Sequence, residues 1–454
     1  MTDLTCFKSY DIRGQLGRDL DADICYRIGR AFVAVIDPGT VVVGRDARES
    51  SPELCDALAR GLRDSGAHVI DIGSCGTEEV YFATSHFEAG GGLMVTASHN
   101  PIDYNGIKLV KAGSRPISAA EGLNEIKALA EANTFPEAEP GVIEARDPRA
   151  DYVEKVLSFV DQSALKPLKI LVNAGNGQAG PSFDAIARGL SGTPLEFVRM
   201  HHDPDSSFPN GIPNPLLPEN QPVTAQALRD CGADFAVAWD GDFDRCFFFD
   251  ETGRFIDGEY IVGLLAAAFL AKESGAKIVH DPRVMWNTVD IVAENGGEAV
   301  VSLTGHALIK AKMREVDAVY GGEMSAHHYF RNFMYCDSGM IPWLLVAELV
   351  SRSGKPLSSL VSDRMAKFPS SGERNFRLAD PQAAIDAFEA EYLEGASLHD
   401  RLDGISVAYA DWRANLRRSN TEPVVRLNVE TRGDAVLCAE KTAEISALLE
   451  RAGG

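Results

Sequence analysis

A serine and three acidic residues stand at the ends of apolar runs in this 454-residue chain, and together they are suited to moving a phosphoryl group. Ser98 follows the apolar run 93–95, which we expect to be a buried strand. The small polar residues after that run predict a tight turn, so the Ser98 hydroxyl should be displayed rather than packed. The alternative is that these small residues only close a strand.

The acidic residues Asp240, Asp242 and Asp244 follow the apolar stretch FAVAW at alternate positions. Alternate side chains of an extended loop can converge on one ion, Gly241 would let the backbone turn, and carboxylate oxygens suit Mg²⁺ or Ca²⁺. A calcium EF-hand is disfavoured, because Arg245 stands where that motif needs glycine and the preceding segment reads as a strand. Mg²⁺ with open positions for a phosphate is the better interpretation; a solvated acidic turn is the alternative.

The serine does not match the known arrangements of a hydrolase nucleophile. The sequence TASHN lacks the G-x-S-x-G pattern. His99 is the direct neighbour of Ser98, so in extended backbone it points the other way and is a poor activating base. A phosphorylated serine instead needs a cation beside it. Lys108 in NGIKLV is a further candidate for neutralising the phosphoryl group or shuttling a proton.

Two further motifs suit the rest of a sugar phosphate. In GGEMSAHHY, Glu323 and Ser325 are spaced to read paired sugar hydroxyls, since Glu accepts while Ser both donates and accepts. A metal site from His327 and His328 is the alternative, although adjacent histidines diverge. In LRRSNTEP, Arg and polar donors suit a phosphate that is held rather than transferred, and a plain surface turn is the alternative. These phosphate candidates are Arg417, Arg418, Ser419, Asn420 and Thr421.

Helix-like and strand-like stretches alternate over most of the chain, which favours α/β domains with parallel sheets. Open α/β sheets bind ligands at the carboxyl ends of their strands, where the polar residues above stand. From about Phe368 the pattern changes to antiparallel strands with two helices, typical of a smaller α+β domain. We expect four domains: 1–150 with the serine loop, 151–253 with the metal loop, 254–367 with the sugar loop, and 368–454 for phosphate binding.

The composition of the chain limits which binding partners and which cell compartment we expect. The net charge of -22 disfavours nucleic acid and anionic membranes, and we see no basic patch. The longest apolar run, 261–271, is too short to span a bilayer, and the N-terminus does not read as a signal peptide. Eight cysteines lie scattered without C-x-x-C spacing, as expected for reduced structural thiols. We therefore expect a cytoplasmic protein, in which an anionic small substrate would need local Arg and Lys side chains.

The motifs SYDIRG, TASHNP, DGDFDR, TGH, GEMSAHH and RRSNTEP, in this order, resemble the α-D-phosphohexomutase family and its bacterial mannose-phosphate branch. This resemblance spans essentially the whole chain. It implies three similar α/β domains with mixed or parallel sheets and a C-terminal α+β domain around a central cleft.

The resemblance also implies roles for residues of this chain. Ser98 would be the phosphoserine, and Ser98, Asp240, Asp242 and Asp244 would hold Mg²⁺, flanked by Arg245. Catalytic candidates besides Ser98 and Arg245 are Lys108, His306 and Arg13. The implied substrate-binding residues are Tyr10, His99, Asn100, Arg283, Glu323, Ser325, His327, Arg417, Ser419, Asn420 and Thr421.

The implied reaction is interconversion of mannose 6-phosphate and mannose 1-phosphate through a hexose 1,6-bisphosphate, which would also serve as activator. It would feed GDP-mannose synthesis, with glucose phosphates as further substrates, in a monomer or weak homodimer. Many family members carry glycine where this chain has Ala326, which could restrict the loop and the acceptance of glucose. The alternatives are phosphoglucomutase as the main activity, a Mg²⁺-dependent sugar phosphatase, and a non-enzymatic calcium or sugar-phosphate binding protein.

Overall fold

The structure is a computed structural model that describes residues 3–418 and 424–454. The chain forms two compact units. The first contains the residues up to Phe255 together with His327–Leu357, and the second contains Ile256–Ala326 and Ser358–Gly454. Each unit therefore combines segments that lie far apart in the sequence.

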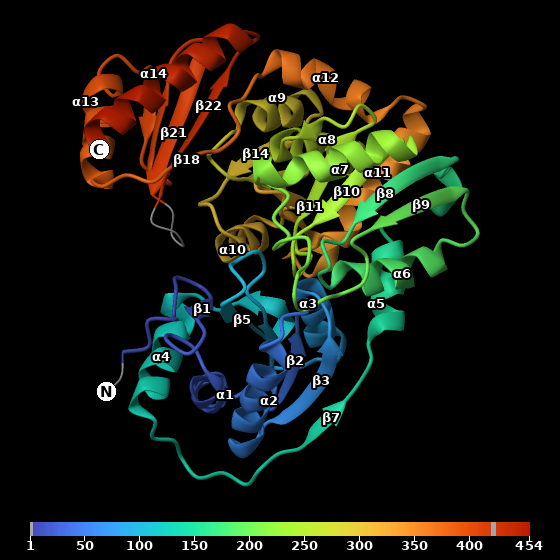
Figure 1. The fold of residues 1–454 in the computed structure, drawn as a ribbon, viewed down its shortest axis with the longest axis vertical. Coiled ribbons are helices and arrows are strands. Elements are labelled where there is room, and N and C mark those ends of the chain that lie inside the picture. The colour runs from blue at the N-terminus through green and yellow to red at the C-terminus, as the bar shows by residue number, and fades with distance from the viewer. Residues whose placement is uncertain (1–2, 419–423) are drawn as a thin grey trace. The chain divides into compact units, whose positions relative to one another are not determined.

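The N-terminal region is a mixed sheet packed against helices (Figure 1). Its elements are β1 (Ile12–Gln15), α1 (Ala22–Ile36), β2 (Thr40–Arg45), α2 (Ser51–Asp64), β3 (His68–Ser74), α3 (Thr77–His86), β4 (Gly91–Val95), β5 (Tyr104–Lys111), β6 (Arg115–Pro116), α4 (Leu123–Ala132) and β7 (Ile143–Ala145). The strand order is β1-β5-β4-β2-β3-β7, with β6 paired to β5. Strands β4, β2, β3 and β7 are parallel neighbours. The predicted βα alternation is confirmed here, and every residue of β4 is buried.

The next region of the first unit carries the acidic loop. Its elements are α5 (Arg149–Leu157), β8 (Leu168–Asn173), α6 (Ala179–Gly189), β9 (Leu195–Met200), α7 (Gln221–Cys231), β10 (Phe235–Trp239), β11 (Cys246–Asp250) and β12 (Phe255–Ile256). Strand β8 is parallel to both β9 and β10, whereas β10 and β11 are antiparallel and joined by the turn 240–245. The first unit also includes β16 (His328–Phe330), β17 (Cys336–Asp337) and α11 (Met340–Ser353).

The second unit begins with another α/β region. Its elements are α8 (Gly258–Lys272), β13 (Lys277–His280), α9 (Trp286–Glu294), β14 (Glu298–Val301), α10 (His306–Val316), β15 (Tyr320–Gly322) and α12 (Leu357–Lys367). Strand β13 is parallel to both β14 and β15. Their carboxyl ends therefore place the loops 281–285 and 323–326 at one edge of the sheet.

The C-terminal region is an antiparallel sheet with two helices, as predicted. Its elements are β18 (Arg374–Phe376), α13 (Pro381–Tyr392), β19 (Leu398–Asp400), β20 (Ile405–Ala408), β21 (Trp412–Arg418), β22 (Val425–Thr431) and α14 (Ala435–Gly453). The order is β18-β22-β21-β20-β19. A buried apolar cluster joins the sheet to both helices and includes Phe388, Leu427 and Leu449. The predicted class, three α/β regions followed by an α+β region, is confirmed.

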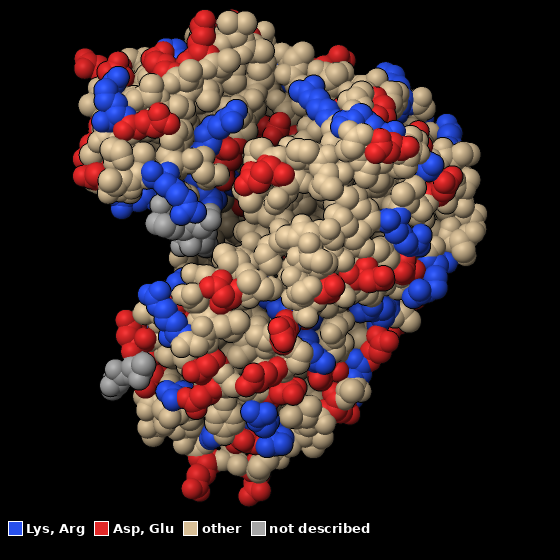
Figure 2. Space-filling view, in the orientation of Figure 1, with Lys and Arg blue, Asp and Glu red and all other residues tan. Residues whose placement is uncertain are grey.

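The surface carries charges of both signs. On the face drawn in Figure 2, Lys and Arg side chains are interspersed with Asp and Glu side chains. Among the described residues, no helix has both the length and the apolar composition needed to cross a membrane.

Candidate active site

Ser98 lies on the turn between β4 and β5. Its φ of 48° is in the left-handed region, so the predicted tight turn is confirmed. The prediction that the hydroxyl is displayed was wrong, because Ser98 is only 2% exposed. The Ser98 Oγ donates a hydrogen bond of 2.7 Å to Asp240 Oδ2. The turn therefore directs the hydroxyl inward, onto the acidic loop.

His99 does not point away from its neighbour, and that prediction was also wrong. The His99 Nδ1 lies 3.0 Å from Ser98 Oγ. The reason is the left-handed backbone at Ser98, since only extended backbone sends successive side chains to opposite sides. Arg245 also contacts His99 Nδ1. Burial, reinforced by Arg245, lowers the pKa of His99, so the imidazole next to the serine is neutral.

Arg48, a residue that we did not predict from the sequence, holds the backbone of the serine turn. The Arg48 guanidinium is 1% exposed and donates to the carbonyl oxygens of Ser98 at 3.1 Å and Asn100 at 2.6 Å. It also donates to the carbonyl oxygens of Pro101 and Tyr104, at 2.8 and 3.1 Å. One planar fork thus fixes most of the loop that carries Ser98.

Three aspartates converge at the turn between β10 and β11. Carboxylate oxygens of Asp240, Asp242 and Asp244 lie within 4.8 Å of one another, and all three residues are buried. Asp242 Oδ1 and Asp244 Oδ1 accept no hydrogen bond within the described part of the chain. Buried oxygens with free lone pairs and a cluster of negative charge fit a hard divalent cation such as Mg²⁺. The predicted convergence of the three acids is confirmed.

Gly241 has a different role from the one predicted. It has no positive φ; the left-handed residue of this turn is Phe243, with φ 46°. A Cβ on Gly241 would lie 2.6 Å from the carbonyl oxygen of Ser98. Glycine is therefore needed for the close approach of the acidic loop to the serine loop, not for the turn itself.

Lys108 on β5 reaches the same carboxylates from the other side. Its Nζ donates to Asp242 Oδ2 at 2.7 Å and to Asp244 Oδ2 at 2.5 Å. Burial alone would lower the pKa of Lys108, but the two aspartates raise it above its ordinary value. The Lys108 ammonium therefore stays charged. Of the two predicted roles, this favours neutralising a phosphoryl group over shuttling a proton.

Thr77 at the start of α3 completes this cluster. Its Oγ1 donates to Asp242 Oδ2 at 2.6 Å, and its backbone N–H donates to the Asp242 carbonyl oxygen at 3.1 Å. Lys108 Nζ lies 3.3 Å from the same hydroxyl. Thr77 thus fixes the orientation of one of the three metal-loop carboxylates.

Arg245 and His327 also contact the aspartates of the acidic loop, and both lie in the first unit. Arg245 Nε lies 3.1 Å from Asp240 Oδ2, and Arg245 forms an isolated β-bridge with His327. His327 Nε2 lies 3.6 Å from Asp244 Oδ1, and Asp337 is within 4.8 Å of both. The structure therefore brings His327 to the acidic loop.

Arg13 and Asn100 form a pair beside the serine turn. Arg13 donates to the side-chain oxygen of Asn100 and, at 3.0 Å, to Asp11 Oδ2. Tyr10 directly precedes Asp11 and is partly exposed. All three candidates thus belong to the first unit, with Ser98.

The second unit gathers the sugar-reading candidates around Arg283. Its NH2 lies 3.4 Å from Glu323 Oε1 and 3.2 Å from Ser325 Oγ. Asp281 holds the Arg283 side chain at 3.1 and 2.9 Å and accepts from the backbone N–H of Met324 at 2.8 Å. His306 begins α10 next to Gly305, whose N–H donates to Glu323 Oε1 at 3.0 Å.

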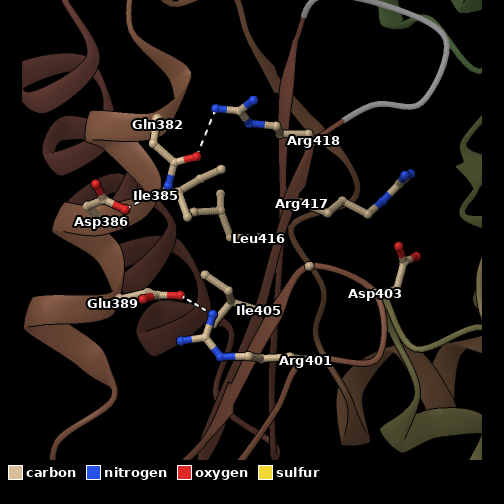
Figure 3. Close-up of a pocket in the computed structure, with 11 residues that line it drawn as sticks. Gln382, Ile385, Asp386, Glu389, Arg401, Asp403, Ile405, Leu416, Arg417 and Arg418 are labelled. Carbon is tan, nitrogen blue, oxygen red and sulfur yellow. Dashed lines mark hydrogen bonds and ion pairs between the residues drawn. The ribbon is translucent and has the colours of Figure 1, made fainter.

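Arg417 and Arg418 leave β21 on opposite sides (Figure 3). Arg418 donates to Gln382 of α13 at 3.0 Å, while Arg417 points away from that helix and donates to Glu373 Oε2 at 3.2 Å. Both line a cavity of about 500 Å³ beside α13. Ser419, Asn420 and Thr421 lie outside the described residues.

Four supporting residues were missed in the sequence: Arg48, Thr77, Asp281 and Glu373. Arg48 and Asp281 follow the ends of apolar strands, β2 and β13, which was the signal that identified Ser98 and the acids. Thr77 and Glu373 offered no comparable signal, because each gains its role from a partner far along the chain.

Four family models match successive parts of the chain. They describe phosphoglucomutase/phosphomannomutase α/β/α domain I at residues 5–137, domain II at 150–253, domain III at 257–368, and the C-terminal domain at 373–447. Their order is the order of the four regions described above.

Similar proteins cover the chain from end to end. A phosphomannomutase of Salmonella montevideo is 58% identical over 454 residues, covering 99% of this chain and 100% of its own. A protein named phosphohexose mutases, from Xanthomonas campestris pv. campestris, is 59% identical and covers 98% and 99%. The crystal structure of a phosphoglucomutase/phosphomannomutase family protein from Burkholderia thailandensis superposes with a TM-score of 0.87 at 34% identity, covering 100% and 98%. The chain belongs to the phosphoglucomutase/phosphomannomutase family.

Proposed function

We propose that this enzyme is a phosphomannomutase, an isomerase that interconverts mannose 6-phosphate and mannose 1-phosphate through phosphorylated Ser98. The observation that carries the proposal is the hydrogen bond from Ser98 Oγ to Asp240, within a cluster of three buried aspartates. The names of the relatives in Salmonella and Xanthomonas support the substrate class. Glucose phosphates are further substrates in this proposal.

The transfer step needs a phosphoryl carrier and positive charge around it. Phosphorylated Ser98 donates its phosphoryl group to the free hydroxyl of the sugar, so one P–O bond to serine breaks and one to the sugar forms. We assign neutralisation of the transferred group to Lys108 and Arg245, which contact Asp242 and Asp240. We assign receipt of the hydroxyl proton to His327, which lies beside Asp244.

The product of that step is a hexose 1,6-bisphosphate, which must turn end for end and return its other phosphate to Ser98. Arg417 is the proposed holder of the phosphate that is not being transferred, with Ser419, Asn420 and Thr421. Glu323 and Ser325 read the sugar hydroxyls between the two phosphates. The remaining proposed substrate contacts are Tyr10, His99, Asn100 and Arg283, and Arg13 and His306 are further proposed catalytic residues.

Asp240, Asp242, Asp244 and a phosphoserine oxygen would hold Mg²⁺, which when bound supplies positive charge beside the transferred group. A hexose 1,6-bisphosphate would serve as activator by phosphorylating Ser98. We further propose the four-domain division at residues 150, 253 and 367, a cytoplasmic location, a monomer or weak homodimer, and a place in GDP-mannose synthesis.

Coupled assays with mannose 1-phosphate and glucose 1-phosphate test this function. Both should show isomer formation that depends on Mg²⁺ and a hexose 1,6-bisphosphate, with the mannose compound turned over at least as well. Release of free phosphate in place of isomer formation would indicate a phosphatase. Binding of hexose phosphate without labelling of Ser98 would indicate a binding protein.

A further inference from the structure

Glu373 is a buried carboxylate at the centre of three guanidinium groups in the second unit. Its side chain is 6% exposed. Its Oε2 accepts from Arg417 NH2 at 3.2 Å and lies 3.5 Å from Arg283 NH1, and its Oε1 lies 3.3 Å from Arg426 NH1. Burial would raise the pKa of Glu373, but Arg426, Arg283 and Arg417 hold it below the ordinary value. One charged carboxylate therefore joins three separate segments of the chain.

Two of these three arginines face each other on neighbouring strands of the C-terminal sheet. Arg417 of β21 and Arg426 of β22 are direct cross-strand partners. Like charges opposite each other on a sheet repel. One carboxylate oxygen of Glu373 pairs with Arg417 and the other with Arg426, which offsets this repulsion. The position of Glu373 is fixed on both sides, because Ser371 donates its N–H to Val429 at 2.8 Å and Arg374 pairs with Leu427.

Arg283 carries the connection onward to the sugar-reading loop. The same guanidinium that faces Glu373 lies 3.4 Å from Glu323 Oε1 and 3.2 Å from Ser325 Oγ. Its backbone is held as well, since Arg413 NH1 donates to the Arg283 carbonyl oxygen at 2.9 Å. A continuous chain of contacts thus runs from the hydroxyl readers, through Arg283 and Glu373, to Arg417.

We propose that Glu373 is a positioning residue that fixes the separation between Arg417 and the hydroxyl readers Glu323 and Ser325. This inference rests on the proposed function, in which one fixed spacing must accept a hexose phosphate in either of two orientations. Glu373 occupies only part of the Arg417 guanidinium. The printed bond uses one NH2 of a group that carries five N–H donors, and the buried Arg417 Nε makes no hydrogen bond within the described residues.

The test compares Glu373→Gln and Glu373→Asp with the control Glu444→Gln. Glu444 of α14 lies in the same C-terminal region and pairs with Lys441 at 2.8 Å, and neither residue lines the cavity beside α13. The control therefore removes one ion pair without touching Arg283 or Arg417. For each protein, kcat and KM are measured with mannose 1-phosphate and glucose 1-phosphate. Dissociation constants for mannose 1-phosphate and glucose 1,6-bisphosphate are measured by calorimetry.

Glu373→Gln should raise KM and both dissociation constants about tenfold, because the arginine loses a charged partner that orients it. Its kcat should change less than about threefold, since the phosphoryl transfer itself does not involve Glu373. Glu373→Asp keeps the charge on a shorter side chain and should lie between Glu373→Gln and the wild type. Glu444→Gln should match the wild type.

Equal binding by Glu373→Gln and Glu444→Gln would overturn the inference. Tighter binding by Glu373→Gln would also overturn it, because Glu373 would then compete with the phosphate. If Glu373→Gln does not fold, Glu373→Asp decides by the same binding measurements. A wild type that binds mannose 1-phosphate but forms no isomer contradicts the proposed function, and the binding comparison still decides the role of Glu373. A wild type that binds no hexose phosphate contradicts both.

Discussion

Ser98 Oγ and Asp240 Oδ2 lie 2.7 Å apart, although 142 residues separate them in the sequence. The contact joins the loop after β4 to the loop after β10, and in both loops polar residues follow an apolar strand. A hydroxyl next to three clustered carboxylates is poised to carry a phosphoryl group only if a cation balances the charge. The relationship between these two residues therefore ties the chemistry of the serine to the metal loop.

Arg48→Lys should weaken catalysis without removing any group that touches the substrate. The variant loses the planar fork that holds the carbonyl oxygens of Ser98 and Asn100. Losing two charge-assisted hydrogen bonds costs about 3 kcal/mol, part of which should appear as a roughly tenfold lower kcat. Arg45→Lys is the control, because Arg45, the last residue of β2, precedes Arg48 closely in the sequence but pairs with Asp71 instead. Steady-state kinetics in which both variants retain full kcat would contradict this role.

Thr77→Val should weaken Mg²⁺ activation. The substitution keeps the shape of the side chain but removes the hydroxyl that donates to Asp242 Oδ2. Residues that orient metal ligands typically change metal affinity by about tenfold or more. Thr84→Val is the matched control, since Thr84 is buried in the same helix and its hydroxyl donates to the Val80 carbonyl oxygen at 2.7 Å rather than to an aspartate of the acidic loop. The measurement is the Mg²⁺ concentration for half-maximal activity; similar values for both variants would refute the prediction.

Ala326→Gly should stabilise the protein and broaden its substrates. Ala326 has φ 68°, a left-handed conformation that costs a non-glycine residue about 1 kcal/mol. Glycine removes this strain, although it also gains entropy in the unfolded chain, so the net gain should stay under about 1 kcal/mol. We expect a slightly higher thermal midpoint and a larger glucose-to-mannose ratio of kcat/KM. A lower midpoint would show that the loop is not strained.

Glu78 should make stability depend on pH. Burial raises the pKa of this carboxyl to about 8, against the opposing effect of its hydrogen bonds from Tyr152 and Ser338 and from the N–H groups of Gly339 and Met340. Because the unfolded chain releases this proton near pH 4.5, the folded state holds more protons between pH 4.5 and 8. Stability should therefore fall as pH rises through this window. Thermal midpoints of Glu78→Gln should fall less steeply than those of wild type; parallel curves would contradict the assignment.

The sequence was most informative where one strand and its following loop decide the structure. The run 93–95 became the fully buried β4, and FAVAW became β10, with the polar residues in the loops that follow. Hydrophobic pattern and turn residues act locally, so they predict such elements well. The convergence of Asp240, Asp242 and Asp244 was predicted for the same reason.

Contacts between distant segments were not predictable in this way. The inward direction of Ser98 depends on a left-handed backbone that no residue type at this position demands. Thr77 meets Asp242 across 165 residues, and Glu373 meets Arg417 across 44, because separate elements pack together. Gly241 looked like a turn residue, and only the neighbouring carbonyl oxygen of Ser98 reveals why a side chain is excluded there.

Phosphorylation of Ser98 is the step without which the proposed reaction cannot occur, and intact-mass spectrometry measures it directly. Wild-type protein incubated with Mg²⁺ and glucose 1,6-bisphosphate should gain the mass of one phosphoryl group, located at Ser98 by peptide mapping. Ser98→Ala should gain none, and its interconversion of mannose phosphates should fall below about one-thousandth of the wild-type rate. Undiminished isomerisation by Ser98→Ala, or a wild type that never carries the added mass at Ser98, would contradict the mechanism.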